Sequence, residues 1–124
     1  MNKKKSDDHR WSSLGKQGKR IIEVLRGVDP NDEMACYEKW MNFLNENLTF
    51  PIEATYSDSD ALYGEDEKVS IKVLSDFFDL YGIIATVRMG RKKLEIPLCE
   101  IEVNDKRSKN HKLINDYNVW FANN

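Results

Sequence analysis

Hydrophobic residues recur with the spacing of a helix in three parts of the chain. In residues 28–48 an apolar side chain returns every three or four positions, as expected of one buried helix face: Tyr37, Trp40, Met41, Leu44 and Leu48. Asp29 is a suitable N-cap for this helix. The same spacing predicts a shorter helix over residues 21–28 and a C-terminal helix over residues 110–122.

Between the second and third helices, apolar residues alternate with polar ones, which predicts β-strands. The expected strands cover residues 50–56, 68–74, the two arms of a hairpin over 83–98, and a short segment within 99–103. Strands this short leave unpaired edges, so we expect the sheet to curl into a partly closed barrel with helices on its open side. The predicted fold class is α+β, a small antiparallel SH3-like β-barrel braced by N-terminal and C-terminal helices.

A chain of 124 residues is long enough for one domain with its own core. Residues 1–14 are polar and charged without periodicity, which predicts a disordered basic tail, and residues 15–124 form the single domain. We expect no membrane association, since no apolar run approaches the roughly 20 residues of a membrane span. Cys36 and Cys99 have no close cysteine neighbours, so we expect two buried free thiols in a cytoplasmic protein.

The charge is distributed unevenly along the chain. The first 20 residues hold seven basic and two acidic side chains, whereas the remaining residues hold 12 basic and 19 acidic ones. Short basic tails usually increase solubility, and the basic hairpin tip at residues 88–93 has no neighbouring aromatic residue on which a base could stack. Nucleic acid is therefore not expected as a partner.

The densest group of acidic residues lies between two predicted strands. Five carboxylates fall within ten residues: Asp58, Asp60, Glu65, Asp66 and Glu67. Calcium prefers six to eight oxygen ligands on a flexible segment, so this loop is a candidate site. It does not match an EF-hand, because Gly64 would occupy position 7 and Val69 position 12 when Asp58 is position 1. The alternative is a solvated connection without a ligand.

A second acidic group precedes the long helix. Asp29, Asp32 and Glu33 lie where a helix favours capping residues and negative charge. This group contains more carboxylates than capping requires, so it is also a candidate metal site.

No arrangement in the sequence indicates catalysis. His9 and His111 are the two histidines, and neither belongs to a catalytic motif. A zinc site would require Cys36, Cys99 and His111 to converge without any ligand pair at motif spacing. We therefore expect no enzyme activity; catalysis would need a concave pocket around His111 or Cys99.

Three separated segments resemble the cyanobacterial calcium-binding protein family (CcbP-like). They are "YEKWMNFLNENLTFPIEA" at 37–54, "GRKKLEIPLCEIE" at 90–102 and "NDYNVWF" at 115–121. The resemblance spans roughly residues 21–121. It implies a small acidic cytoplasmic protein that binds calcium through surface carboxylates, without EF-hands and without catalysis.

The resemblance transfers unevenly to individual residues. An acidic cluster before the aromatic helix is a trait of the family, and Asp29, Asp32 and Glu33 occupy that place. The residues from 58 to 67 correspond to the family only as an acidic loop. The segment "NDKRSKNHK" at 104–112 is a departure, because family members are acidic there. Its cations would weaken a calcium site that lay within about 10 Å, one Debye length at 0.1 M salt.

The sequence therefore predicts a calcium-binding protein of modest affinity, acting as a buffer or sensor through surface carboxylates. The alternative is an SH3-like protein-interaction module that has lost metal binding and docks a protein partner. Calcium should stabilise the fold in the first case, because a ligand that binds only the folded state favours it.

Overall fold

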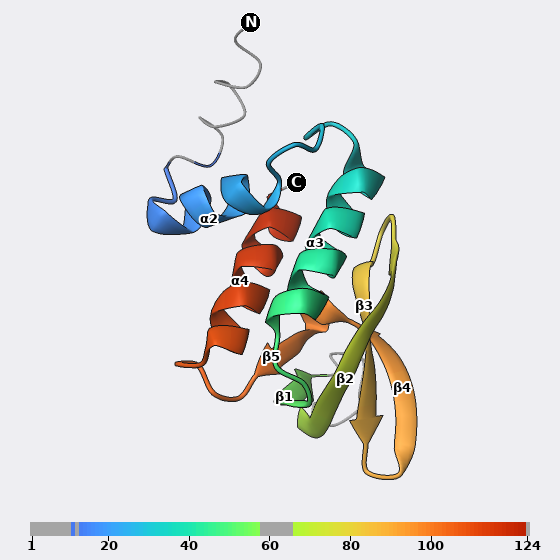
Figure 1. Ribbon diagram of the computed structural model, residues 1–124. Helices are drawn as coiled ribbons and strands as arrows, with labels where there is room; N and C mark the ends of the chain where they lie inside the picture. The colour runs from blue at the N-terminus through green and yellow to red at the C-terminus, as the bar shows by residue number, and fades with distance from the viewer. Residues whose placement is uncertain (1–10, 12, 58–65, 124) are drawn as a thin grey trace, which may run out of the picture.

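The computed structural model describes residues 11, 13–57 and 66–123 (Figure 1). In chain order, the elements are α2 (Lys16–Val24), α3 (Glu33–Asn47), β1 (Ile52–Ser57), β2 (Asp66–Phe78), β3 (Gly82–Met89), β4 (Lys92–Pro97), the 3-10 helix η1 (Leu98–Glu100), β5 (Ile101–Val103) and α4 (Lys109–Ala122). The predicted order of two helices, four or five antiparallel strands and a final helix is confirmed.

The five strands form one antiparallel sheet in the order β4-β3-β2-β1-β5. The α+β class is confirmed, but the prediction that the sheet closes into a barrel is wrong. Within the described chain, β4 pairs only with β3 and β5 only with β1, so the sheet is open. The two edge strands are short, since β5 has only three residues and β4 six, so few backbone groups are left unpaired at the edges.

Strand β2 is longer than its alternating pattern predicted. It continues beyond residue 74 to Phe78 because β3 pairs with it as far as Gly82. The register shifts between Leu74 and Asp76, where a β-bulge interrupts the alternation. The Asn45 side chain of α3 holds this bulge, since it donates to the Leu74 carbonyl at 3.1 Å and accepts from the Leu74 amide at 3.2 Å.

Helix α3 begins later than the sequence predicted. Asp32, and not Asp29, is its N-cap, and the Asp32 carboxylate accepts a hydrogen bond from the Ala35 amide at 3.1 Å. The Asp29 carboxylate instead accepts from the Asn31 amide at 2.9 Å and closes a short turn. This local turn competes with the helix for the same backbone groups, so the helix starts one turn later.

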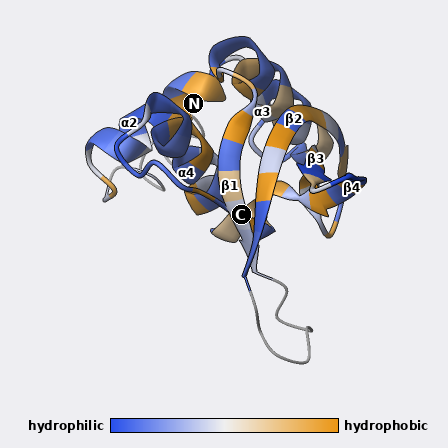
Figure 2. Cartoon of the chain, turned by 90° about the horizontal axis from the view of Figure 1, so that it is seen from below, coloured by the Kyte–Doolittle hydropathy of each residue, from blue (hydrophilic) through white to orange (hydrophobic). Residues whose placement is uncertain are grey.

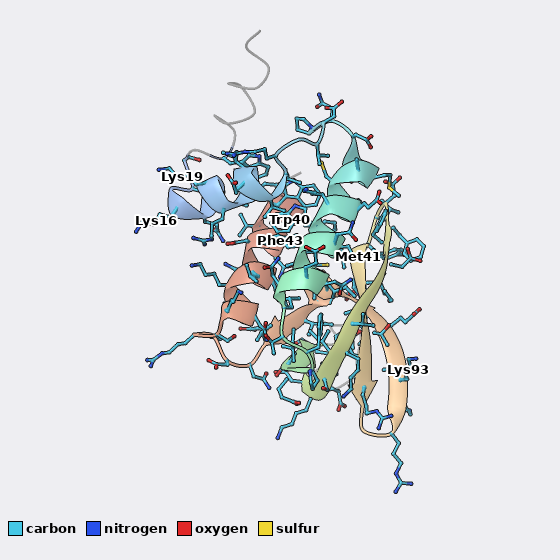
Figure 3. The ribbon with its side chains drawn as sticks, viewed as in Figure 1. Lys16, Lys19, Trp40, Met41, Phe43 and Lys93 are labelled. Carbon is cyan, nitrogen blue, oxygen red and sulfur yellow. The ribbon has the colours of Figure 1, made fainter. Side chains whose placement is uncertain are left out.

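The core lies between the helices and one face of the sheet. Four aromatic side chains from α3 and α4 are its largest buried members: Tyr37, Trp40, Tyr117 and Trp120. Figure 3 shows Trp40 at the junction of α3 and α4. The centroid of its ring lies 5.7 Å from that of Tyr117 and 6.1 Å from that of Trp120. Figure 2 shows apolar residues alternating with polar ones along β1 and β2.

The core extends into the segment predicted to be a disordered tail. Trp11 is only 5% exposed and belongs to the core cluster. Residues 1–10 and residue 12 of the predicted tail lie outside the described residues.

Both cysteines are free, but only Cys36 is buried, so the expectation of a buried Cys99 is wrong. Within the described part of the chain, no helix combines the length and apolar character needed to cross a membrane.

Candidate functional site

Three predicted site residues gather at the N-terminal end of α3. Asp29 lies in the turn before the helix, Asp32 is the N-cap and Glu33 is the first helical residue. All three are exposed. The folded backbone therefore presents three carboxylates on one end of one helix, where the positive end of the helix dipole stabilises their negative charge.

The turn between β2 and β3 brings the backbone of a fourth acidic residue, Asp79, to this end. The hydroxyl of buried Tyr37 donates to the Glu33 carboxylate at 2.9 Å and lies 3.3 Å from the backbone carbonyl of Asp79. Burial raises the pKa of Tyr37, and the hydrogen bond to Glu33 raises it further. The negative charges of Glu33 and Asp79 act in the same direction. Figure 1 shows the β2–β3 turn lying beside the start of α3. We call Asp29, Asp32, Glu33 and Asp79 the α3 acidic cluster.

Gly82 and Tyr117 hold the β2–β3 turn against the helices. Gly82 has a φ of 67°, a conformation that favours glycine, and an added Cβ would overlap the Tyr117 hydroxyl. That hydroxyl accepts a hydrogen bond from the Ile83 amide at 2.9 Å in the buried core. The position of Asp79 therefore depends on packing against α4.

In the part of the chain that the structure describes, no salt bridge reaches the α3 acidic cluster. The salt bridges found in the described chain are Arg20–Asp116, Arg26–Glu23 and Lys106–Glu102, and none involves the cluster. The Cys36 thiol reports the resulting field, because burial and then the charges of Asp32, Asp29 and Glu33 raise its pKa to about 11. Three carboxylates thus act together on one buried group.

The two described members of the acidic loop group lie at the opposite end of β2. Asp66 and Glu67 begin β2 and pair with the end of β1, whereas Asp79 follows the end of β2. A 13-residue strand spans up to about 40 Å, so the two groups do not form one site. The Ser57 hydroxyl already donates to the Asp66 carboxylate at 2.8 Å. The predicted ligands Asp58, Asp60 and Glu65 lie outside the described residues.

The basic segment before α4 is distant from the α3 acidic cluster. Asn110 in the first turn of α4 exchanges hydrogen bonds with the backbone of Thr49, which follows the C-terminal end of α3. The 15 residues of α3 separate that end from the cluster by about 20 Å, roughly two Debye lengths at 0.1 M salt. The positive charges of residues 104–112 are therefore largely screened from the cluster.

The chemistry of the cluster fits a hard dication, although its side chains do not converge in advance. Carboxylate and carbonyl oxygens are the ligands that calcium prefers. Within residues 11, 13–57 and 66–123, no three histidine, cysteine, aspartate or glutamate side chains are arranged closely enough to hold a metal ion. Ion binding at the cluster would therefore require side-chain movement, with backbone oxygens and water completing the ligand set.

A separate cavity of about 310 Å³ lies between β5 and α4, and Cys99 and His111 are among its lining residues. This is the concavity that catalysis would require. Partial burial and the charge of Glu100 raise the pKa of the Cys99 thiol, so it stays protonated near neutral pH and is a weak nucleophile. Cys36 does not line the cavity, and the convergence needed for zinc does not occur.

Sequence reasoning missed two members of the α3 site. Asp79 is not among the predicted ligands, and Tyr37 is predicted only as part of the apolar helix face. The spacing of Tyr37 four residues after Glu33 was a usable signal, because residues i and i+4 are neighbours on a helix. The proximity of Asp79 had no such signal, since it lies 42 residues from Tyr37 in the sequence.

These observations define a small α+β protein that exposes a set of oxygen donors without a salt bridge among the described residues, the type of surface that attracts hard cations. The family whose description is calcium binding, CcbP, matches residues 19–121. The chain therefore belongs to the CcbP family of calcium-binding proteins. Calcium is the ion of this family, and the resemblance noted in the sequence is confirmed.

Two solved structures share the fold. One is described as the crystal structure of Anabaena CcbP, with a TM-score of 0.66 and 21% identity over 84% of this chain and 88% of that one. The other is described as a calcium binding protein in the calcium-binding form, with a TM-score of 0.66 and 17% identity over 90% of this chain and 95% of that one. None of the curated proteins matches this sequence.

Proposed function

We propose that this protein binds calcium at the α3 acidic cluster, with modest affinity and without an EF-hand, as a calcium buffer or sensor. The observation that carries the proposal is the gathering of exposed carboxylates from two distant segments with no salt bridge to any of them in the described chain. Membership in a calcium-binding family supports the choice of ion.

The driving force is relief of repulsion among like charges. Two carboxylates 4 Å apart in water repel each other by about 1 kcal/mol, and more where the protein excludes solvent. A dication beside Asp29, Asp32 and Glu33 removes this repulsion and adds attraction to each charge. Because the cluster is assembled only in the folded state, calcium should stabilise the fold.

Three features explain why we expect modest affinity. The carboxylates are exposed, so solvent and salt screen them. Their side chains do not converge in advance, so binding must order them. The positive end of the α3 dipole favours the carboxylates but opposes a cation placed beside it.

The loop group, Asp58, Asp60, Glu65, Asp66 and Glu67, is not proposed as part of this site. Asp66 and Glu67 lie at the far end of β2, and Asp66 is hydrogen-bonded by Ser57. Any calcium that this group attracts would be a second, separate ion.

A pair of matched variants tests the assignment. Asp29→Asn with Glu33→Gln removes two charges from the cluster, and Asp66→Asn with Glu67→Gln removes two charges from the other end of β2. Isothermal titration with calcium should show at least tenfold weaker binding for the first variant and little change for the second. Equal loss in both variants would contradict the location. Absence of calcium heat for the unaltered protein at millimolar concentrations would contradict the function.

A further inference from the structure

The turn between β2 and β3 exposes a cluster of large apolar side chains. Phe78 is 50% exposed, Leu80 84% and Tyr81 60%. Together with Ile84 and Pro97, they form what we call the turn groove, with a volume of about 670 Å³. Soluble proteins rarely expose contiguous apolar residues in this way unless the surface binds something.

The groove lies on the face of the sheet that the helices do not cover. Along β3, Ile83, Ala85 and Val87 belong to the core cluster, whereas Ile84, which is itself buried at 7% exposure, lies outside that cluster. Successive side chains in a strand point to opposite faces, so Ile84 faces away from the core. It pairs with Pro97 of β4, and these two residues form the floor beside the turn.

The charged residues that line the groove have one sign. They are Asp79 and Glu95, and no lysine or arginine lines it within the described chain. Asp76, which precedes the turn, is exposed as well. An occupant must therefore combine apolar side chains for the floor with positive charge for the rim.

We propose that the turn groove binds a peptide segment of a partner protein, one with bulky apolar side chains flanked by lysine or arginine. Apolar contact with Leu80, Tyr81 and Ile84 would supply affinity, and the carboxylates of Asp79 and Glu95 would select basic flanks. The groove shares Asp79 with the α3 acidic cluster, but the proposal concerns a different function from calcium binding and does not require calcium.

Charge also argues against two other occupants. A symmetric contact between two copies of this chain would place Asp79 and Glu95 against their own equivalents. A membrane rich in anionic lipid would meet the same two carboxylates. In both cases like charges would face each other, whereas a basic segment would neutralise them.

Three fluorescein-labelled peptides of twelve residues test the proposal by fluorescence polarisation. The first carries two leucines and a phenylalanine flanked by lysines, the second replaces the apolar residues with serine, and the third replaces the lysines with glutamate. All measurements contain EDTA, so the result does not depend on calcium. Only the first peptide should bind, and its affinity should fall as salt concentration rises.

Two variants and a control locate the contact. Leu80→Ser with Tyr81→Ser should weaken binding of the first peptide at least tenfold, and Asp79→Asn with Glu95→Gln at least threefold. Leu14→Ser, which changes an apolar residue that is 37% exposed elsewhere, should have no effect. Circular dichroism checks that each variant is folded.

Several outcomes would overturn the proposal. The first is no binding of the lysine-flanked peptide, and the second is equal binding by the Leu80 and Tyr81 variant. A third is dimerisation in sedimentation experiments that this variant abolishes, which would assign the groove to a second copy. A fourth is binding to vesicles of phosphatidylserine and phosphatidylcholine, but not to the peptide, which would assign it to a membrane.

Discussion

Carboxylates occur in two contrasting environments in this protein, one buried and the other exposed. Asp116 of α4 is 2% exposed, and Arg20 donates to it from Nε at 2.7 Å and from Nη2 at 3.0 Å, while Gln17 donates at 3.0 Å. Asp29, Asp32 and Glu33 are exposed and have no salt bridge in the described chain. A buried carboxylate must be neutralised internally, whereas an exposed one can leave its charge available to an ion.

This contrast separates a carboxylate that holds two helices together from carboxylates that do not. The bidentate contact fastens α2 to α4 and raises the pKa of the Arg20 guanidinium through its hydrogen bond with Asp116. The α3 acidic cluster holds no pair of elements together by charge. Its charges instead act on Cys36, whose pKa is raised first by burial and then by Asp32, Asp29 and Glu33.

Breaking the buried pair should have the largest effect. Asp116→Ala leaves Arg20 without its partner and Gln17 without its acceptor, so we expect a loss of about 3 kcal/mol in the free energy of unfolding. Urea denaturation measures it. Glu23→Gln, which breaks an exposed pair with Arg26, is the control and should change stability by less than about 1 kcal/mol. Similar losses in the two variants would remove the distinction between buried and exposed carboxylates.

Alkaline pH should sharpen the comparison through Cys36. Its pKa is raised from 9.0 to about 11 in the folded protein, so folding favours the protonated thiol. The resulting stability is complete below pH 9 and is lost as pH rises toward 11, by about 2 kcal/mol. Chemical denaturation at several pH values should show a shallower decline for Cys36→Ala.

The carboxylate share of this effect can be isolated. In a Cys99→Ser background, carbon-13 NMR of Cys36 should give a lower pKa when Asp29, Asp32 and Glu33 are replaced by their amides. The same pKa should fall when calcium is added to the unaltered cluster. A Cys36 pKa that neither change moves would show that burial alone raises it.

The smallest effect distinguishes the two roles of Asp32. Asp32→Asn keeps a good N-cap but removes the charge, whereas Asp32→Ala removes both. In EDTA, we expect Asp32→Asn to unfold at the same thermal midpoint as the unaltered protein. Asp32→Ala should unfold at a lower midpoint, because it loses about 1 kcal/mol in the free energy of unfolding. With calcium, both should show a smaller stabilisation than the unaltered protein. Full calcium stabilisation of Asp32→Asn would exclude Asp32 from the site.

Element types were predictable because they depend on local spacing. The apolar stripe of α3, the hairpin turn at Gly90 and the C-terminal helix all appear where the pattern placed them. The errors occur where a local preference competes with another interaction. Asp29 and Asp32 are both acceptable caps, and only the turn closed by Asp29 decided between them.

The amino-acid sequence alone determined the order of helices and strands, the acidic character of the segment before α3 and membership in a calcium-binding family. Tertiary structure decided which charges meet. It brought the Glu33 carboxylate and the Asp79 backbone to the same Tyr37 hydroxyl, separated Asp66 from that cluster, moved the basic segment to the far end of α3 and neutralised Asp116 with Arg20. The reason is physical: spacing along a chain fixes neighbours within a few residues, whereas electrostatic energy depends on distance in space.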